Sequence, residues 1–384
     1  MIFRNSEIKI KELIQYFPCV AIVGPRQVGK TTLVKQITGE DGSDYIYIDL
    51  ENPTDYNRLN DSFSLFNQFP DNSFVIDEVQ RRKELFPILR SVIDANRKPG
   101  RFILLGSASP DLIRDSSESL AGRIAYSELM PLNILEIVNE FSIDKLWING
   151  GFPVAFTETV PQNIWMENFI RTYIERDLIQ LGFPGNTVNA RRLWQMLAHI
   201  HGNILNYSEL SRSIELDVKT VINYIQFLES AFLIHILQPY FINIKKRLVK
   251  SPKVYLRDSG VLHYFLGIEN KKELIGHPKM GASWEGFVIE QIKANLKTNR
   301  YIYFYRTHDG AELDLIIERG GVPVAGIEIK YGSNFTPSRG NTEAIQTLNT
   351  KDNFIIVREN EDFIHKNFRV CGIEIFLKKY LPKI

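Results

Sequence analysis

The strongest chemical signal in the sequence is the octapeptide GPRQVGKT, which begins at Gly24 and fits the phosphate-loop pattern G-x-x-x-x-G-K-[ST] at every fixed position. Glycines let several backbone N–H groups point at one phosphate chain, while Lys30 reaches the β- and γ-phosphates. A glycine-rich turn with an unrelated lysine is the alternative, but the apolar run before the motif and the helix formers after it favour a phosphate loop. The pattern therefore predicts a nucleoside triphosphate site formed by Gly24, Pro25, Arg26, Gln27, Val28, Gly29, Lys30, Thr31 and Thr32.

Two acids follow the apolar run FVI at positions 74–76. In phosphate-loop enzymes, the first acid at such a strand end helps to hold magnesium, and the second polarises the attacking water. We therefore expect Asp77 and the Thr31 hydroxyl to hold Mg²⁺ and Glu78 to act as the general base. The alternative for Glu78 is a solvated residue that caps the next helix.

Two further residues are candidates for contact with the γ-phosphate. Ser107 follows the apolar run FILLG, at the strand end where open α/β sheets bind ligands. It is expected to hydrogen-bond the γ-phosphate or the attacking water, or else to cap a loop. Arg123 carries a planar guanidinium that could stabilise transition-state charge in its own site or in a neighbour's, or it is a surface arginine.

The elements that must position these residues alternate along the chain. Apolar runs at 20–23, 45–50, 74–78 and 101–105 read as strands, and helical spacing of apolar residues separates them. This alternation predicts an α/β fold with a mostly parallel sheet and helices on both faces.

A second cluster of acids is expected near the carboxyl end. Strands are predicted at 301–305, 312–317 and 324–330, with His308-Asp309-Gly310 as a turn. Because side chains alternate along a strand, Glu312 and Asp314 share one face, as do Glu328 and Lys330. Paired strands would bring Asp314, Glu328 and Lys330 together, and such acids need a divalent cation between them. A charged stripe on a half-buried sheet is the alternative.

The middle of the chain predicts a helix-turn-helix. A short helix at 207–214, a tight turn and a long helix at 219–237 are followed by an alternating, basic hairpin at 242–256. This order is typical of a winged helix, which binds duplex DNA or docks proteins. The predicted phosphate contacts are Lys245, Lys246, Arg247, Lys250 and Lys253.

The segments GPRQVGKTTL, VIDEVQR, LLGSAS and SLAGRI, followed by GGFP and FIRTYIERDL, together resemble bacterial and archaeal AAA-type ATPases of poorly characterised function. That family usually carries a C-terminal domain similar to PD-(D/E)XK nucleases. The resemblance implies ATP as the nucleotide and a cytoplasmic setting. The D-x(13)-E-x-K spacing of Asp314, Glu328 and Lys330 is similar to the nuclease motif, although no proline precedes Asp314. Glu285, or in the alternative Glu290, would be a further acid that joins Asp314 and Glu328 as a metal ligand.

Composition sets the remaining expectations. With 384 residues the chain should form several domains, which we predict as a P-loop ATPase domain (1–130), a helical lid (131–182), a winged-helix domain (183–267) and a nuclease-like domain (268–384). The net charge of +1 means that any nucleic-acid surface must be a local patch. Two cysteines and the lack of an 18-residue apolar run predict a reducing compartment and no membrane span.

The leading hypothesis is an ATP-hydrolysing, magnesium-dependent machine of the AAA class that engages DNA, with cleavage at the C-terminal acids left open. The alternative is a nucleotide-gated binding or signalling module whose nuclease-like domain is a silent docking surface. A homo-oligomer is expected if Arg123 acts on a neighbour.

Overall fold

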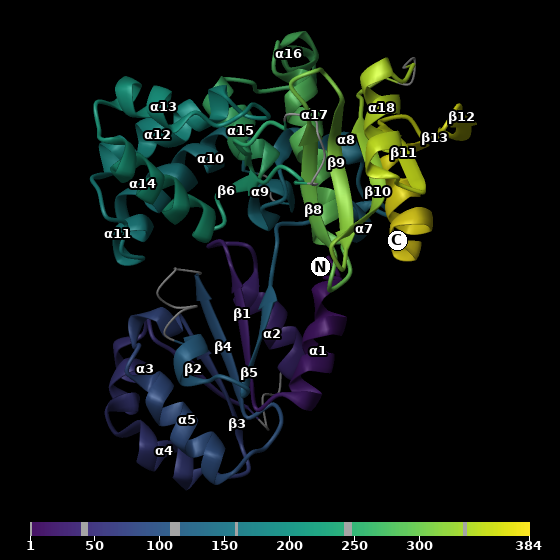
Figure 1. Cartoon of the computed structure of the whole chain (residues 1–384). Coiled ribbons are helices and arrows are strands. Elements are labelled where there is room, and N and C mark those ends of the chain that lie inside the picture. Colours follow the sequence, from purple (N-terminus) through teal and green to yellow (C-terminus); the bar gives the residue numbers. More distant parts are fainter. Residues whose placement is uncertain (1, 40–44, 108–115, 158–159, 242–247, 333–335) are drawn as a thin grey trace.

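The computed structural model describes residues 2–39, 45–107, 116–157, 160–241, 248–332 and 336–384. Figure 1 shows the amino-terminal α/β part below and the remaining helices and the second large sheet above it. Within the described ranges, no helix has the length and apolar character needed to cross a membrane.

The amino-terminal part contains a five-stranded sheet in the order β2-β3-β4-β1-β5, in which every neighbouring pair is parallel. The central strands are fully buried because their apolar runs are covered on both faces. The predicted parallel α/β fold is therefore confirmed. The strands are β1 (Cys19–Gly24), β2 (Tyr45–Asp49), β3 (Ser73–Asp77), β4 (Phe102–Ser107) and β5 (Ile124–Glu128).

Alternate residues of β1 pack into two different cores, which shows that helices cover both sheet faces. Ala21 and Val23 join the core that includes Phe66 and Leu89, whereas Val20 and Ile22 join the core that includes Ile10 and Leu33. The helices of this part are α1 (Ser6–Tyr16), α2 (Lys30–Thr38), α3 (Pro53–Arg58), η1 (Leu59–Asp61), α4 (Ser62–Gln68), η2 (Val79–Arg81) and α5 (Leu85–Ala95).

The middle of the chain is mainly helical, and its described residues contribute to two hydrophobic cores. Residues of α7 and α8 pack with the C-terminal sheet, whereas residues from α10 to α15 form another core, and α9 contributes Phe156 to the first and Ala155 to the second. The helices are α7 (Ile134–Ile137), α8 (Ile143–Asn149), α9 (Pro153–Thr157), α10 (Gln162–Thr172), the π-helical turn η3 (Tyr173–Asp177), α11 (Leu178–Gln180), α12 (Thr187–His199), α13 (Tyr207–Ile214), α14 (Val218–Ser230), α15 (Ser259–Leu266) and α16 (Lys271–Gly276).

The helix-turn-helix region differs from its prediction after the second helix. Helix α14 ends at Ser230 rather than at Leu237, because Phe232 adopts a positive φ of 61° that a helix cannot continue. The next residues form β6 (Ile234–Leu237), which pairs antiparallel with β7 (Lys253–Leu256). The hairpin was predicted to lie entirely within 242–256. In the described residues only its second strand, β7, lies there, and its partner β6 comes before residue 242.

The C-terminal part holds a mixed sheet in the order β12-β13-β11-β10-β9-β8. Helix α17 (Met280–Ala294) and helix α18 (Arg339–Leu348) contribute to the cores on its two sides. Strand β13 stops at Gly372, where a helical turn follows, although the apolar residues continue to Phe376. The strands are β8 (Tyr301–Arg306), β9 (Glu312–Arg319), β10 (Val322–Ile329), β11 (Asp352–Val357), β12 (Asp362–His365) and β13 (Phe368–Gly372), and the chain closes with α19 (Ile373–Ile375), η4 (Phe376–Tyr380) and η5 (Leu381–Lys383).

Candidate functional site

The phosphate loop connects β1 to α2, and its two glycines are required for different reasons. A Cβ on Gly24 would lie 2.4 Å from the backbone carbonyl oxygen of Leu129, so only glycine fits there. Gly29 precedes α2 with a φ of 97°, which an L side chain rarely adopts. The loop is therefore shaped both by close approach of another chain segment and by left-handed backbone.

Lys30 lies inside this loop and is buried. Its Nζ donates to the carbonyl oxygens of Gly24 at 3.1 Å and of Pro25 at 2.9 Å. Burial lowers the pKa of Lys30 to about 8, although Glu78 and Asp77 oppose the shift. The ammonium group is thus held by neutral acceptors at the place where a phosphate chain would meet it.

Asp77 ends β3, beside the start of α2. Thr31 Oγ1 donates to Asp77 Oδ2 at 2.7 Å, and Tyr47 on the neighbouring strand β2 donates to the same oxygen. Hydroxyl and carboxylate oxygens are hard donors of the kind that Mg²⁺ prefers, so these residues fit the predicted ion. Tyr47 is not among the residues predicted for the site, and its only signal in the sequence is its place near the end of a strand beside β3.

Glu78 and Ser107 face the same cavity, which has a volume of about 310 Å³. Glu78 has a φ of 56°, and burial raises the pKa of its carboxyl group while Lys30 opposes that shift. Ser107 ends β4 opposite Gly24 of β1 and is buried. The cavity is lined by Arg26, Glu51, Glu78, Gln80, Arg81, Ser107, Asp177, Gln180 and Leu181.

An ion-pair chain that the sequence analysis missed joins this cavity to the helical middle part. Arg26 of the phosphate loop pairs with Asp177 of η3, and its second nitrogen lies 3.2 Å from Glu51. Arg176 lies 3.1 Å from the same Glu51 carboxylate. The segment FIRTYIERDL therefore contacts the phosphate loop directly, a contact that depends on the fold and leaves no local pattern.

Arg123 is not near the phosphate loop of its own chain. It precedes β5, and its backbone carbonyl accepts from the N–H of Cys19, at the edge of the sheet opposite Gly24. Its guanidinium pairs with Asp94 at 2.6 and 2.8 Å. The expectation that Arg123 serves its own site is wrong because parallel strands begin and end at opposite edges; contact with a neighbour's site stays a prediction.

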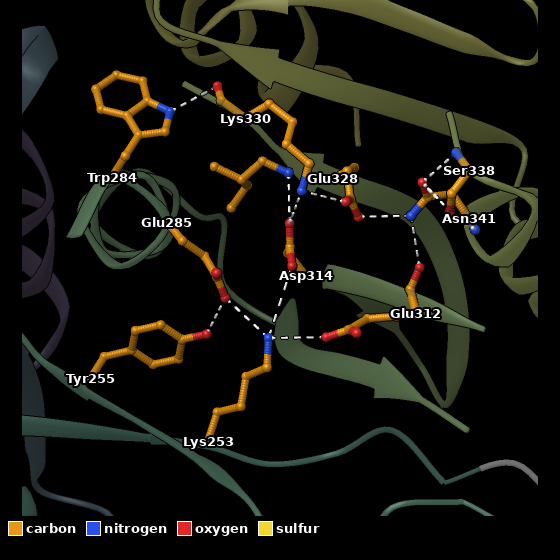
Figure 2. Close-up of polar contacts among 11 residues, drawn as sticks. Lys253, Tyr255, Trp284, Glu285, Glu312, Asp314, Glu328, Lys330, Ser338 and Asn341 are labelled. Atoms are coloured by element: carbon orange, nitrogen blue, oxygen red, sulfur yellow. Dashed lines mark hydrogen bonds and ion pairs between the residues drawn. The ribbon is translucent and has the colours of Figure 1, made fainter. Parts of the chain in front are cut away.

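The predicted C-terminal acids do lie together, as Figure 2 shows. Lys330 Nζ lies 2.7 Å from Glu328 Oε1 and 3.9 Å from Asp314 Oδ2. Asp314 also accepts from the Ile329 N–H at 2.8 Å, and Glu328 accepts from the Asn341 amide at 3.0 Å. Strand pairing of β9 with β10 produces this convergence.

Glu285 of α17 joins this cluster, but Glu290 does not. Glu290 is paired instead with His235 at 2.6 Å and Arg257 at 3.0 Å. We call the group formed by these C-terminal residues the acid cluster. It consists of Glu285, Glu312, Asp314, Glu328 and Lys330.

Lys253 of β7 also enters the acid cluster, which contradicts its predicted role as a DNA contact on an exposed wing. It is only 4% exposed, and its Nζ lies 3.1 Å from Glu285, 3.4 Å from Glu312 and 3.9 Å from Asp314. Burial lowers the pKa of Lys253, but the three carboxylates outweigh it and the net shift is upward. Pairing with β6 turns this side chain inward; Lys250 is exposed, and Lys245, Lys246 and Arg247 lie outside the described residues.

A metal ion does not fit the acid cluster in this arrangement. Burial, together with Asp314, raises the pKa of Glu285 to about 7 and of Glu328 to about 8. Two ammonium groups, from Lys253 and Lys330, already lie between the carboxylates. Among the described residues, no group of three or more His, Cys, Asp or Glu side chains is arranged to hold a metal ion. The prediction of Asp314, Glu328 and Glu285 as ligands is therefore not supported.

Comparisons with known proteins agree with the geometry of the amino-terminal part. Residues 16–138 match a family model described as an AAA domain, and residues 140–272 and 280–376 match domains of unknown function (DUF8612 and DUF4143). Together with the parallel sheet and the phosphate loop, this match defines an AAA-type P-loop ATPase fold.

The chain is 42% identical over 347 residues to the uncharacterized proteins Rv2008c of Mycobacterium tuberculosis and Mb2031c of Mycobacterium bovis, covering 90% of this chain and 77% of theirs. It belongs to the same family as these proteins. The uncharacterized protein MJ1544 of Methanocaldococcus jannaschii is 22% identical over 346 residues, which cover 82% of this chain and 74% of that protein. The Walker-type ATPase PABY2304 of Pyrococcus abyssi superposes with a TM-score of 0.42 at 14% identity, covering 69% of this chain and 96% of that one.

Proposed function

We propose that the chain binds ATP with Mg²⁺ at the phosphate loop and hydrolyses it to ADP and phosphate. The observation that carries the proposal is the hydrogen bond from Thr31 Oγ1 to Asp77 Oδ2 beside the buried Lys30. These three groups come from α2 and β3, and their types match the cation and phosphate chemistry of a triphosphate site. When bound, Mg²⁺ would neutralise charge on the phosphate oxygens.

Glu78 is the group that we assign to the attacking water. It accepts the proton of that water as the oxygen bonds to the γ-phosphorus and the bond to the β-phosphate oxygen breaks. Its raised pKa supports this role, because a carboxylate in a buried cavity is a stronger base. Ser107, which lines the same cavity, is placed in this proposal as a donor to the γ-phosphate or to the water.

The test separates binding from turnover. Glu78→Gln keeps the size of the side chain and should lower ATP hydrolysis by about 10²- to 10⁴-fold while ATP binding remains. Lys30→Ala should lose both binding and turnover. Glu84→Gln is the matched control, since Glu84 is an exposed acid six residues away that pairs with Arg82. Unchanged hydrolysis in Glu78→Gln would remove Glu78 from the site.

We propose further that ATP binding gates contacts with the middle of the chain. Arg26 belongs to the phosphate loop and pairs with Asp177, so a triphosphate would compete with Asp177 for this guanidinium. Limited proteolysis with and without ATP tests the idea: the cleavage pattern of the middle part should change in the wild type and stay constant in Arg26→Ala. A constant pattern in the wild type would count against gating.

A second candidate function is engagement and cleavage of DNA through the C-terminal domain. The convergence of Asp314, Glu328 and Lys330 on neighbouring strands favours a nuclease-like domain. The neutralisation of these acids by lysines, and the inward position of Lys253, weigh against it. We therefore rank the nucleotide-gated binding function first. Cutting of supercoiled or single-stranded DNA with Mg²⁺ or Mn²⁺ that disappears in Asp314→Asn would reverse this ranking.

A further inference from the structure

The acid cluster contains a lysine that its own domain does not supply. Its four carboxylates come from α17, β9 and β10, and Lys330 follows β10. Lys253 instead lies on β7, within the segment that matches a different domain family, at residues 140–272. The middle part thus contributes one cation to a cluster that belongs to the C-terminal part (Figure 2).

The position of Lys253 is fixed on both sides by its backbone. The N–H of Leu205 donates to Pro252 O at 2.7 Å, and the N–H of Gly202 donates to Val254 O at 2.8 Å. Residue 253 itself is paired with Leu237 of β6 and bridged to Ile204. The strand that carries this ammonium group is therefore anchored through its backbone on both sides.

A second residue of the same strand makes the same contact. Tyr255 lies two residues beyond Lys253, so both side chains project from one face of β7. The Tyr255 hydroxyl donates to Glu285 Oε1, the oxygen that Lys253 also contacts. Two groups from β7 therefore hold one carboxylate of α17, which makes this a built contact between domains rather than a chance approach.

The place of the Lys253 ammonium is also the place that a divalent cation would need. Nζ lies between Glu285 and Asp314, at 3.1 and 3.9 Å from their oxygens. A Mg²⁺ or Mn²⁺ ion that bound these two carboxylates would stand close to the ammonium group, in a buried setting where like charges repel strongly. The two cations therefore exclude each other.

We propose that Lys253 is the resident cation of the acid cluster, that it locks the middle part onto the C-terminal domain, and that divalent cations enter only when β7 withdraws it. This proposal is independent of ATP hydrolysis, because it involves neither the phosphate loop nor nucleotide. In this proposal Lys253 keeps divalent cations out of the acid cluster. The spacing of the D-x(13)-E-x-K residues alone does not indicate this role.

The experiment measures Mn²⁺ binding to the full chain without nucleotide, by electron paramagnetic resonance of the free ion and by calorimetry. The wild type and Asp314→Asn should bind Mn²⁺ equally weakly. Lys253→Met removes the charge at similar volume and should bind one Mn²⁺ at least about tenfold more tightly. Adding Asp314→Asn to Lys253→Met should abolish the gain. Lys250→Met, an exposed lysine three residues earlier, is the matched control and should behave as the wild type.

Two results would overturn the proposal. One is Mn²⁺ binding by the wild type that Asp314→Asn removes, which would mean that Lys253 excludes nothing. The other is a folded Lys253→Met, checked by circular dichroism, that gains no affinity. If Lys253→Met does not fold, Mn²⁺ binding by the wild type that Asp314→Asn removes would still overturn the proposal, because both of these proteins keep Lys253.

Discussion

The affinity for ATP should fall steeply at alkaline pH because of the environment of Lys30. Its Nζ is buried and donates to the carbonyl oxygens of Gly24 and Pro25, and burial lowers its pKa to about 8. Phosphates bind the ammonium form, so a bound triphosphate raises this pKa again. Binding then requires proton uptake above about pH 8.

The size of the effect follows from the fraction of Lys30 that carries its proton. Below pH 8 most molecules hold the ammonium form, whereas one unit above it about one in eleven does. The affinity should therefore drop about tenfold between about pH 7 and pH 9, or about 1.4 kcal/mol, and about thirtyfold by about pH 9.5. A lysine with the ordinary pKa of 10.5 would change affinity by only about a few per cent over the first interval.

The assay is a titration with a fluorescent ATP analogue at constant Mg²⁺ and ionic strength. Lys30→Arg supplies the control, because a guanidinium does not titrate in this range and its weaker affinity should stay constant with pH. A wild-type affinity that is flat to about pH 9.5, while the control is also flat, would refute the argument that burial depresses this pKa.

Three further predictions concern stability and reactivity. Gly24→Ala should lower the free energy of unfolding by about 1–3 kcal/mol or more, because its Cβ would strike the Leu129 carbonyl. Gly29→Ala should lower it by about 1–2 kcal/mol, because the φ of Gly29 is positive. Urea unfolding that reverses this order would contradict the packing around Gly24. Burial raises the pKa of Asp258 from 3.8 to about 6, so the contribution of this residue to stability should fall by about 3 kcal/mol as pH rises from about 4 to 6. The difference in unfolding free energy between the wild type and Asp258→Asn should change by this amount. Cys19 and Cys371 are buried with raised thiol pKa values, so a thiol reagent should label them rapidly only in urea.

The amino-terminal site was predictable from the sequence because its chemistry is local. The glycines, Lys30 and Thr31 lie within eight consecutive residues, and Asp77 directly ends an apolar strand. Parallel strands place their carboxyl ends at one edge, so the order of elements alone brought these groups together. The same rule, applied to Arg123, would have excluded it from its own site, since that residue precedes its strand.

The partners of Arg26 and of the acid cluster were not predictable, because they depend on how separate parts pack. Arg26 and Asp177 are 151 residues apart, and Lys253 and Glu285 are joined through a strand that the sequence analysis placed in an exposed basic wing. The number of lysines near a helix-turn-helix indicates the charge of that region but not where each side chain points. The pairing of β7 with β6 turns Lys253 inward. Because Lys253 is buried, its partner is the neighbouring C-terminal domain and not, as predicted, DNA.

The two acid sites differ in the kind of donor that meets the carboxylate, and for this reason we expect a divalent cation at Asp77 rather than at Asp314. At Asp77 the side chains that donate to Oδ2 are the hydroxyl groups of Thr31 and Tyr47, which are neutral and can yield to an ion or turn an oxygen toward it, while the Lys30 ammonium is held by backbone carbonyls. At Asp314 the neighbours are the ammonium groups of Lys253 and Lys330, which already satisfy the negative charge and would repel a second cation. Acid spacing is therefore a weaker guide to metal binding than the charge of the groups that the fold brings to those acids.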